Sequence, residues 1–344
     1  MTEPLRLTQM TGQGGCSAKI AQADLHAVLG GIATEAGGDL LVSAPTMDDA
    51  AVYRLGPGLA LVATTDFFPP PVDDPHAYGA IATANALSDV YAMGGVPLLL
   101  LNLVGYDLAN LDGGVLRQIL EGGAEVAAEA GCAIAGGHSI RSSEPLFGCA
   151  VVGRVDPERM VTNQGARPGD VVFLTKPLGT GVILNAHKQA EVDDAVLGEA
   201  ISVMRRLNRG AAQAMLRAAA TAATDVTGFG LVGHAHNLAS ASAVRLHIHA
   251  RMLPVLNGAV ELVRAGKVPG GSRRNLELAR EQAHIATDLE RELVVLACDA
   301  QTSGGLLVTI PESGAASFAA AVPEARRIGE VTSTLTGRPR VELV

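Results

Sequence analysis

The chain has 344 residues, with 26 Lys and Arg against 35 Asp and Glu, which gives a formal net charge of -9. Because a domain usually holds about 100–200 residues, this length predicts two domains. A hydrophobic fraction of 48% and a charged fraction of 18% exclude a disordered chain. The surplus of acid, the 3% of aromatic residues and the absence of Trp argue against a nucleic-acid-binding surface.

The sequence shows no sign of a membrane or secreted protein. The N-terminus MTEPLRLTQM lacks a basic stretch followed by an apolar core, and the most apolar run, Val96 to Val104, is interrupted by Asn102. That run is far shorter than the roughly 20 residues of a membrane helix. No two cysteines lie at zinc or redox spacing, and Cys132, Cys149 and Cys298 stand in apolar runs that indicate burial. We therefore expect a cytoplasmic protein without disulfide bonds or membrane contact.

The first half of the chain predicts a loop followed by an α/β domain. Residues 1–20 have no apolar period and contain GQGGCSAK, which indicates a mobile glycine-rich segment. Residues 21–156 alternate helices and strands at close intervals, a pattern typical of layered α/β packing. In chain order we expect a helix at Leu25 to Ala36, a strand at Leu59 to Ala63, a helix at His76 to Met93, a strand at Val96 to Val104, a helix at Val115 to Ala130, and strands at Cys132 to Ala135 and Leu146 to Val155.

A polar segment then predicts a domain boundary. Residues 156–170, DPERMVTNQGARPGD, contain two prolines and two glycines and no apolar period. A C-terminal domain is expected over residues 168–344. Its predicted elements are a strand at Val171 to Leu174, helices beginning at Gly181 and Asp194, a glycine-rich turn at Asp225 to Gly233, a strand at Val244 to Ile248, a helix at Leu256 to Ala265, an irregular loop at Pro269 to Arg274, and a strand at Leu306 to Ile310.

Aspartates in otherwise apolar or glycine-rich surroundings are the first candidate site residues. They are Asp48 and Asp49 in TMDDAAVY, Asp66 in TTDFF, Asp89 in NALSDVYAMGG and Asp225 in ATDVTGFG. A carboxylate in an apolar helix or at the end of a strand is unfavourable unless it is paired or metal-bound. For Asp48, Asp49 and Asp225 taken singly, a helix cap or a turn is the alternative. Without a His/Cys cluster, gathered carboxylates suit Mg²⁺, which binds through a few acids together with the phosphates of a nucleotide.

The segment GQGGCSAKI is the second candidate. Cys16 and Lys19 lie three residues apart among glycines and can converge on one point. The ammonium and nearby backbone amides are expected to lower the pKa of the thiol, and Lys19 would suit a transferring phosphoryl oxygen. The alternative is an incidental exposed cysteine on a frayed terminus.

Two glycine motifs are interpreted differently. AGGHSI, with Gly137, His138 and Ser139 after a strand, predicts close approach of backbone to a ligand, with an ordinary turn as the alternative. The pattern GxGxxG at Gly228 to Gly233 does not indicate a dinucleotide site, because ATDVT before it is not a clear apolar strand and no acid follows about 20 residues on.

Taken together, these segments resemble the selenophosphate synthetase (selenide, water dikinase) family over essentially the whole length. The matching segments are LTQMTGQGGCSAKI, DDAAVY, TTDFF, NALSDVYAMGG, AGGHSI, EPLFG, LTKPLGTGV, TDVTGFGLVGH, VPGGSRRN and DAQTSGGLL. The opening cysteine–lysine segment separates this family from its structural relatives, which include aminoimidazole-ribonucleotide synthetase and thiamine-monophosphate kinase.

The resemblance implies synthesis of selenophosphate from ATP, selenide and water, with release of AMP and orthophosphate. It implies a homodimer of two-domain α/β chains with the aminoimidazole-ribonucleotide synthetase-like fold, whose N-terminal sheets pair, and a requirement for Mg²⁺ and a monovalent cation, typically K⁺. By motif, the essential residues are Cys16 and Lys19, and the metal ligands are Asp49, Asp66, Asp89 and Asp225. Implied nucleotide contacts are Lys19, Thr46, Met47, Asp48, Asp66, Asp89, Gly137, His138 and Ser139.

The chain departs from the family pattern at three positions. Ala18 stands where many members have a second cysteine, Arg141 where GGHSID has its acid, and Ala300 where DPQTSGG has proline. Arg141 puts the detailed contacts of its loop in doubt but does not touch the carboxylates. The alternatives are a metabolite kinase of the same fold and a non-catalytic nucleotide sensor or selenium carrier, and direct docking to downstream selenium-using enzymes stays open.

Overall fold

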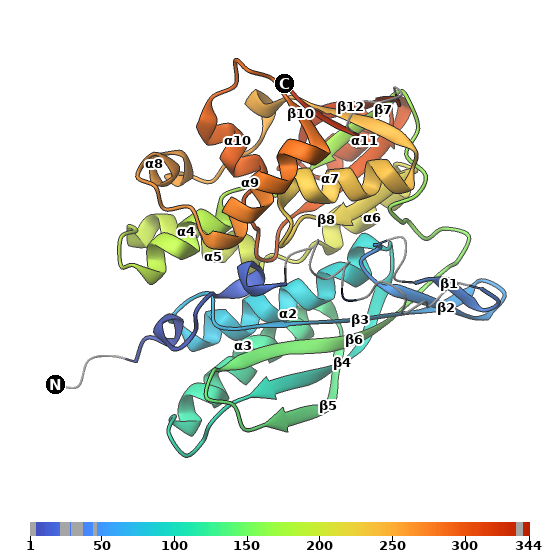
Figure 1. Ribbon diagram of the computed structural model, residues 1–344. Helices are drawn as coiled ribbons and strands as arrows, with labels where there is room; N and C mark the ends of the chain where they lie inside the picture. The colour runs from blue at the N-terminus through green and yellow to red at the C-terminus, as the bar shows by residue number, and fades with distance from the viewer. Residues whose placement is uncertain (1–4, 21–27, 29–36, 44–46, 335–339) are drawn as a thin grey trace.

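The computed structural model describes residues 5–20, 28, 37–43, 47–334 and 340–344, in which two α/β domains lie against each other (Figure 1). The described N-terminal domain has one sheet in the order β1-β2-β3-β6-β4-β5. Neighbouring strands are antiparallel except for the parallel pair β4–β5. The strands are β1 (Leu40–Val42), β2 (Ala51–Gly56), β3 (Leu59–Phe68), β4 (Val96–Gly105), β5 (Ala133–Ile140) and β6 (Leu146–Val155).

Two helices, α2 (Pro75–Ala92) and α3 (Gly113–Ala130), cover one face of this sheet (Figure 1). Helix α2 begins where Asp74 accepts a hydrogen bond from the backbone N–H of Ala77, with Pro75 in the first turn. Almost every residue of α2 is buried, because the helix packs on the sheet, on α3 and on the C-terminal domain. Glycine lets the two helices touch: a Cβ on Gly79 would lie 1.8 Å from the carbonyl oxygen of Ile119.

The opposite face of the sheet is apolar and exposed. Side chains alternate between the faces of a strand. Cross-strand partners share a face, so the outward-pointing side chains of β2, β3, β6 and β4 lie next to one another on one surface. The exposed large apolar side chains on this outer face include Tyr53, Leu59, Phe67, Val96 and Leu101.

The described C-terminal domain has a sheet in the order β10-β13-β9-β12-β7-β11-β8. Its strands are β7 (Asp170–Leu174), β8 (Ala222–Asp225), β9 (Val244–Ile248), β10 (Ala283–Ile285), β11 (Leu306–Pro311), β12 (Arg326–Ser333) and β13 (Val341–Leu343). Its helices are α4 (Thr180–Lys188), α5 (Asp194–Arg205), α6 (Arg209–Arg217), α7 (Gly230–Ala241), α8 (Ala259–Arg264), α9 (Gly270–Gln282), α10 (Arg291–Ala297) and α11 (Glu312–Ala321), with a 3-10 turn η4 at Ala250–Met252. No helix in the described part of the chain is long and apolar enough to span a membrane.

Three expectations for the elements are wrong. The segment predicted as an irregular loop, Pro269 to Arg274, opens helix α9, whose glycine- and arginine-rich first turns carry little apolar signal. The strand predicted to end at Ala135 continues through AGGHSI to Ile140 as β5. ATDVT does include a strand, β8, which is fully buried although it ends in polar residues. The helix expected at Leu25 to Ala36 falls almost entirely outside the described residues.

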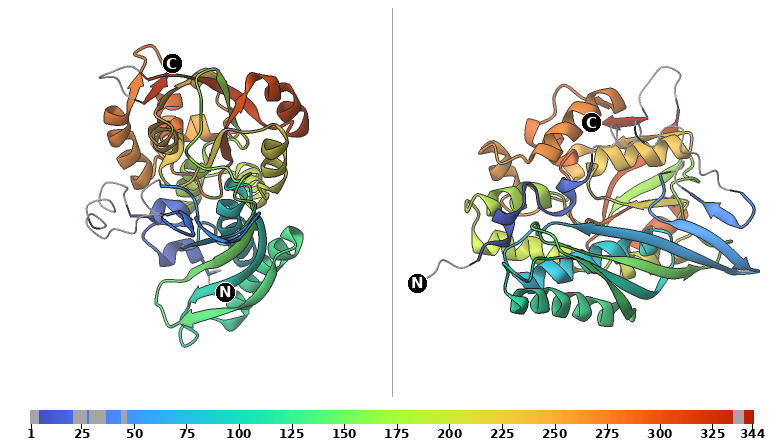
Figure 2. Two further views of the ribbon diagram at one scale, coloured as in Figure 1. Left: turned by 90° about the vertical axis from the view of Figure 1, so that its right-hand side faces the viewer. Right: turned by 60° about the horizontal axis from the view of Figure 1, so that its bottom comes forward.

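Residues 5–20 run between the two domains, as the views in Figure 2 show. They form two 3-10 turns, η1 (Leu7–Met10) and η2 (Gly15–Ala18). Arg6 forms an ion pair with Asp73 at 2.9 Å, and Lys188 donates to the carbonyl oxygen of Gly12 at 2.8 Å. The segment therefore docks on both domains, and its mobility stays a prediction.

Candidate active site

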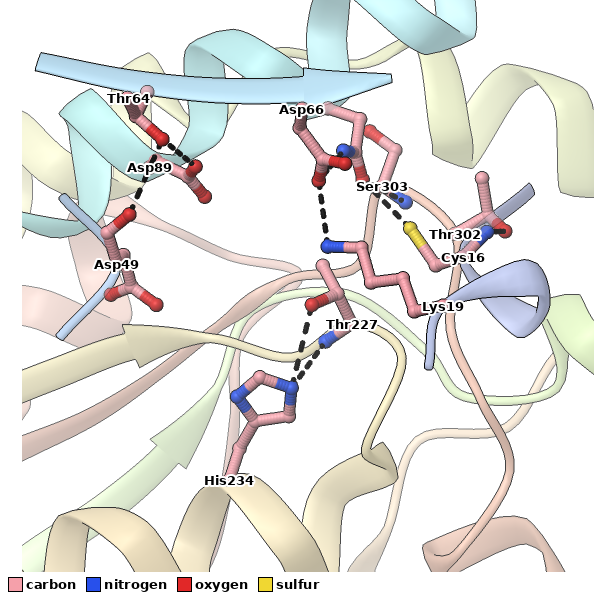
Figure 3. Close-up of polar contacts among 11 residues, drawn as sticks. Cys16, Lys19, Asp49, Thr64, Asp66, Asp89, Thr227, His234, Thr302 and Ser303 are labelled. Atoms are coloured by element: carbon pink, nitrogen blue, oxygen red, sulfur yellow. Dashed lines mark hydrogen bonds and ion pairs between the residues drawn. The ribbon is translucent and has the colours of Figure 1, made fainter. Parts of the chain in front are cut away.

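Three of the predicted aspartates meet where the domains touch. Asp49 precedes β2, Asp89 lies on α2 and Asp225 ends β8, and each offers one carboxylate oxygen within 4.8 Å of the others. The hydroxyl of Thr224 donates to Asp49 across the domain junction at 2.8 Å, and that of Thr64 donates to Asp89 at 2.5 Å. The two domains thus assemble one carboxylate trio, Asp49, Asp89 and Asp225, shown in part in Figure 3.

The trio has the electrostatics of a cation site. Burial and then the neighbouring carboxylates raise the pKa of Asp49 and of Asp89 well above the ordinary value. Burial raises the pKa of Asp225 to about 6, although a hydrogen bond from Ser88 opposes the rise. Among the described residues, Oδ2 of Asp49 and Oδ2 of Asp225 are buried without a hydrogen-bond partner. Unpartnered buried carboxylate oxygens fit a hard divalent cation such as Mg²⁺.

Asp66 belongs to a second group beside the trio. Its Oδ2 forms an ion pair with Nζ of Lys19 at 2.8 Å and accepts from the side-chain amide of Asn85 at 2.6 Å. Burial lowers the pKa of Lys19, but the charge and hydrogen bond of Asp66, together with the charges of Cys16 and Asp89, outweigh that effect and leave the pKa well above its ordinary value. Asp66 therefore holds a cation of the protein itself and is not one of the three grouped carboxylates.

Cys16 lies in this second group and is 1% exposed. Its thiol lies 3.4 Å from Oδ1 of Asn85, and its backbone N–H donates to the hydroxyl of Thr302 at 3.1 Å (Figure 3). The approach to Thr302 requires glycine at position 15, where φ is +60° and a Cβ would lie 2.3 Å from that hydroxyl. The three residues Asn85, Thr302 and Gly15 therefore fix the position of the sulfur.

The predicted lowering of the thiol pKa is wrong. Burial raises the pKa of Cys16 to about 12, which outweighs the opposing effect of Lys19. Removing the thiolate from water is more unfavourable than the nearby ammonium is favourable. The resting group is a protonated thiol.

The loop after α10 supplies contacts that the sequence analysis did not assign to the site. Ser303 has φ of +49°, donates its N–H to Oδ1 of Asn85 at 3.0 Å and accepts from Nζ of Lys176 at 2.9 Å. Lys176 is 2% exposed, and burial, with the charge of Arg206, lowers its pKa to about 7. Both residues stand in segments that match the family, LTKPLGTGV and DAQTSGGLL, and that match is the sequence signal for them.

His234 on α7 is a further buried neighbour. Its Nε2 accepts from the backbone N–H of Thr227 at 3.1 Å, and burial, with the charge of Lys19, lowers its pKa to about 3. It is therefore a neutral imidazole that supports the turn after Asp225 (Figure 3).

The predicted nucleotide turn is anchored to the segment between the domains. Asp48 accepts from the backbone N–H of Asn163 at 2.6 Å, and the side chain of Asn163 donates to the carbonyl oxygen of Met47 at 2.7 Å. Met47 has φ of +53°. Thr46 lies outside the described residues.

The other predicted nucleotide contacts, Gly137, His138 and Ser139, do not lie beside the carboxylate trio of their own chain. Gly137 on β5 lies in register with Asp66, but three strands away across β4 and β6, which is about 14 Å at the usual strand spacing. His138 lies in register with Phe67 on the exposed outer face. Ser139 is exposed, like the rest of β5.

A cleft of about 590 Å³ opens beside Lys19, large enough for a small-molecule ligand. A smaller cavity of about 170 Å³ adjoins Ser17 and Thr302 on the same N-terminal segment. Lining residues of the larger cleft include Gln13, Lys19, Phe67, Glu144 and Arg274.

Comparison with known proteins first defines the class. Residues 47–155 match the N-terminal domain of AIR synthase related proteins, and residues 167–342 match the C-terminal domain. Among solved structures, thiamine-monophosphate kinase from Stenotrophomonas maltophilia is 21% identical with a TM-score of 0.64, covering 95% of this chain and 96% of that one. The hydrogenase maturation protein HypE in complex with ATP is 20% identical with a TM-score of 0.62, covering 95% and 92%. These neighbours show the fold.

Sequence relatives give the particular family. The selenide, water dikinase of Myxococcus xanthus is 44% identical over 98% of this chain and 97% of its own length. That of Caldanaerobacter subterraneus subsp. tengcongensis is 45% identical over 92% of this chain and 91% of its own length. The chain belongs to the selenide, water dikinase family, so the resemblance seen in the sequence is confirmed.

Proposed function

We propose that this chain synthesises selenophosphate from ATP, selenide and water and releases AMP and orthophosphate. The observation that carries the proposal is the meeting of Cys16 and Lys19 with a trio of carboxylates at one domain junction. Its membership of the selenide, water dikinase family supports the same reaction.

Asp49, Asp89 and Asp225 would hold Mg²⁺, since two of their buried oxygens lack a partner in the described structure. When bound, Mg²⁺ supplies positive charge that turns the repulsion between these acids and the ATP phosphates into attraction. We assign Asp66 a different role, that of orienting Lys19 through their ion pair. The need for K⁺ is carried over from the family resemblance, without an assigned site.

Lys19 stabilises charge on the transferring phosphoryl group. Its ammonium borders the 590 Å³ cleft, and its raised pKa keeps it protonated at neutral pH. Removing one positioned donor to a developing negative charge typically lowers the rate by about 10²–10³. The preceding turn η2 (Gly15–Ala18) holds its backbone in place, because the N–H of Lys19 donates to the carbonyl oxygen of Cys16 at 3.2 Å.

Cys16 orients selenium rather than attacking phosphorus. The pKa of about 12 leaves its thiol protonated, so selenide itself is the nucleophile. Selenide attacks the γ-phosphorus, a P–Se bond forms, and the bond to the β–γ bridging oxygen breaks to leave ADP. Water then attacks the β-phosphorus of ADP and releases orthophosphate and AMP. Residues 5–20 contact both domains beside the site, where they would restrict the access of water to the first step.

We further propose a homodimer that covers the apolar outer face of the N-terminal sheet. Exposed apolar patches of this kind mark interaction surfaces. Such a dimer would let β5, with Gly137, His138 and Ser139, approach the nucleotide of a second copy. Leu101→Asp on this face should shift the sedimenting species from dimer to monomer, whereas Met252→Asp, at a similarly exposed apolar position in the C-terminal domain, should not.

Anaerobic phosphorus NMR of the purified chain with ATP, Mg²⁺ and selenide tests the reaction. We expect selenophosphate, AMP and orthophosphate in equal amounts, lost in Cys16→Ala and Lys19→Met and retained in the control Cys298→Ala, which removes a buried thiol outside the site. ADP with a phosphorylated metabolite would instead indicate a kinase, and bound but unconsumed ATP a sensor. Selenide-dependent AMP formation in either site variant would contradict the residue roles. The domain limits at 21–156 and 168–344, a cytoplasmic location and docking of selenium-using enzymes stay predictions.

A further inference from the structure

A group of imidazole and carboxylate side chains lies on the C-terminal sheet, away from the trio. His247 lies on β9, His249 follows directly after the last residue of that strand, and Glu330 on β12 is the cross-strand partner of His247. Strand β9 is four positions from β8 in the sheet, about 19 Å at the usual spacing, so the group is separate from Asp225.

The geometry of this group suits a metal ion. His247, His249 and Glu330 each offer one ligand atom, and the three atoms lie within 4.8 Å of one another. Nε2 of His249 is 3.4 Å from a carboxylate oxygen of Glu330. That separation is long for a charge-assisted hydrogen bond, which is usually about 2.7–2.9 Å. It matches the spacing of two ligands about 2.0–2.1 Å from a tetrahedral Zn²⁺, which is about 3.4 Å.

Neighbouring residues supply the carboxylate that usually orients a metal-binding histidine. Nδ1 of His247 is 3.4 Å from a carboxylate oxygen of Glu342. Glu342 lies on β13, on the opposite side of β9 from β12, and is the cross-strand partner of His247 on that side. Glu342 is held in turn by Arg245, 3.3 Å away and buried. A carboxylate beside one ring nitrogen fixes the imidazole and directs the other nitrogen outward.

We propose that His247, His249 and Glu330 form a binding site for a borderline divalent transition-metal ion, with Zn²⁺ as the representative, oriented by Glu342. Two imidazoles with one carboxylate select such ions over Mg²⁺, which prefers oxygen ligands. The three protein ligands leave a fourth position open to water or a ligand. The bound ion ties β9 to β12 in the middle of the C-terminal sheet. The proposal is independent of the reaction proposed above.

Equilibrium dialysis with Zn²⁺ alone as the probe tests the site, on untagged full-length chain with saturating Mg²⁺ to occupy the carboxylate trio. We expect His249→Gln and Glu330→Gln to lose one zinc equivalent or at least about tenfold in affinity, and Glu342→Gln to lose about tenfold or more. His76→Gln is the matched control, because His76 faces a single carboxylate, Glu125, at 3.3 Å and should bind as wild type does.

Two further readouts separate metal binding from a structural effect. Co²⁺ in place of Zn²⁺ should give visible absorption bands of a tetrahedral site in wild type and in His76→Gln, and not in His249→Gln. Zinc should raise the melting temperature of wild type and leave that of His249→Gln unchanged. Equal zinc stoichiometry and affinity in all the variants, or octahedral Co²⁺ spectra throughout, would overturn the proposal.

Discussion

The substitution Asp225→Asn tests whether the negative charge of the carboxylate trio destabilises the folded protein when no metal is bound. In the metal-free chain, burial raises the pKa of Asp225 from 3.8 to about 6. Because one pKa unit equals about 1.4 kcal/mol, the ionised carboxylate destabilises the folded state by about 3 kcal/mol at neutral pH. Asparagine keeps the shape and removes the charge. With EDTA at pH 7.5, the variant should therefore be the more stable protein, by about 4 °C in melting temperature if both domains unfold together.

The pH dependence has a defined sign. Between about pH 4 and pH 6 the folded chain binds more protons at Asp225 than the unfolded chain does, so wild-type stability falls as pH rises. The difference between wild type and Asp225→Asn should therefore grow through this window and level off above it. Mg²⁺ should reverse the order at pH 7.5, because it binds the wild-type trio and stabilises only the folded state.

Differential scanning calorimetry of both proteins at pH 4, 5, 6 and 7.5, with EDTA and then with Mg²⁺, measures these effects. Calorimetry also shows whether the two domains unfold in one transition, on which the size of the shift depends. A metal-free variant less stable than wild type at pH 7.5 would refute the reasoning, and so would equal stabilisation of both proteins by Mg²⁺.

Three other substitutions or labelling experiments examine separate features. Gly79→Ala places a Cβ 1.8 Å from the carbonyl oxygen of Ile119 and should lower the free energy of unfolding, measured by urea titration, by about 3 kcal/mol or more. The control Gly198→Ala, which has open space around it in α5, should raise the free energy of unfolding by about 0.5–1 kcal/mol. Between pH 7 and pH 10 the stability of the wild type should rise with pH, because the buried amine of Lys176, with its pKa of about 7, releases a proton on folding there. Lys176→Met should remove this rise, and an unchanged dependence of stability on pH would contradict the lowered pKa. Cys16, whose pKa is about 12, should react with iodoacetamide far more slowly at pH 8 than free cysteine does, as followed by mass spectrometry of the labelled peptide, and fast labelling would show that the thiol is not buried.

Local patterns predicted much of the N-terminal domain. Helix α2 and strand β4 follow closely from continuous apolar runs, at Pro75–Ala92 and Val96–Gly105. Strand β8 was not predicted, because it is only four residues long and turns its polar end into the site. Helix α9 was not predicted, because glycine and arginine in its first turns break the apolar period. These elements depend on tertiary burial, which a local pattern does not contain.

The candidate site divides in the same way. Residue type and motif were enough to select Cys16, Lys19 and the trio. They could not show that Asp66 pairs with Lys19 and stays outside the trio, because that depends on which side chains meet across the domain junction. The direction of the thiol pKa was mispredicted, since spacing to Lys19 is visible in the sequence and the depth of burial is not. Lys176 appears as an ordinary surface residue type until the fold buries it.

Cys16 contacts both domains of the molecule. Its backbone is hydrogen-bonded to Thr302 of the C-terminal domain, and its side chain contacts Asn85 of the N-terminal domain. Any displacement of one domain against the other would therefore break one of these two contacts. The position of this thiol therefore depends on the contact between the two domains as much as on its own segment.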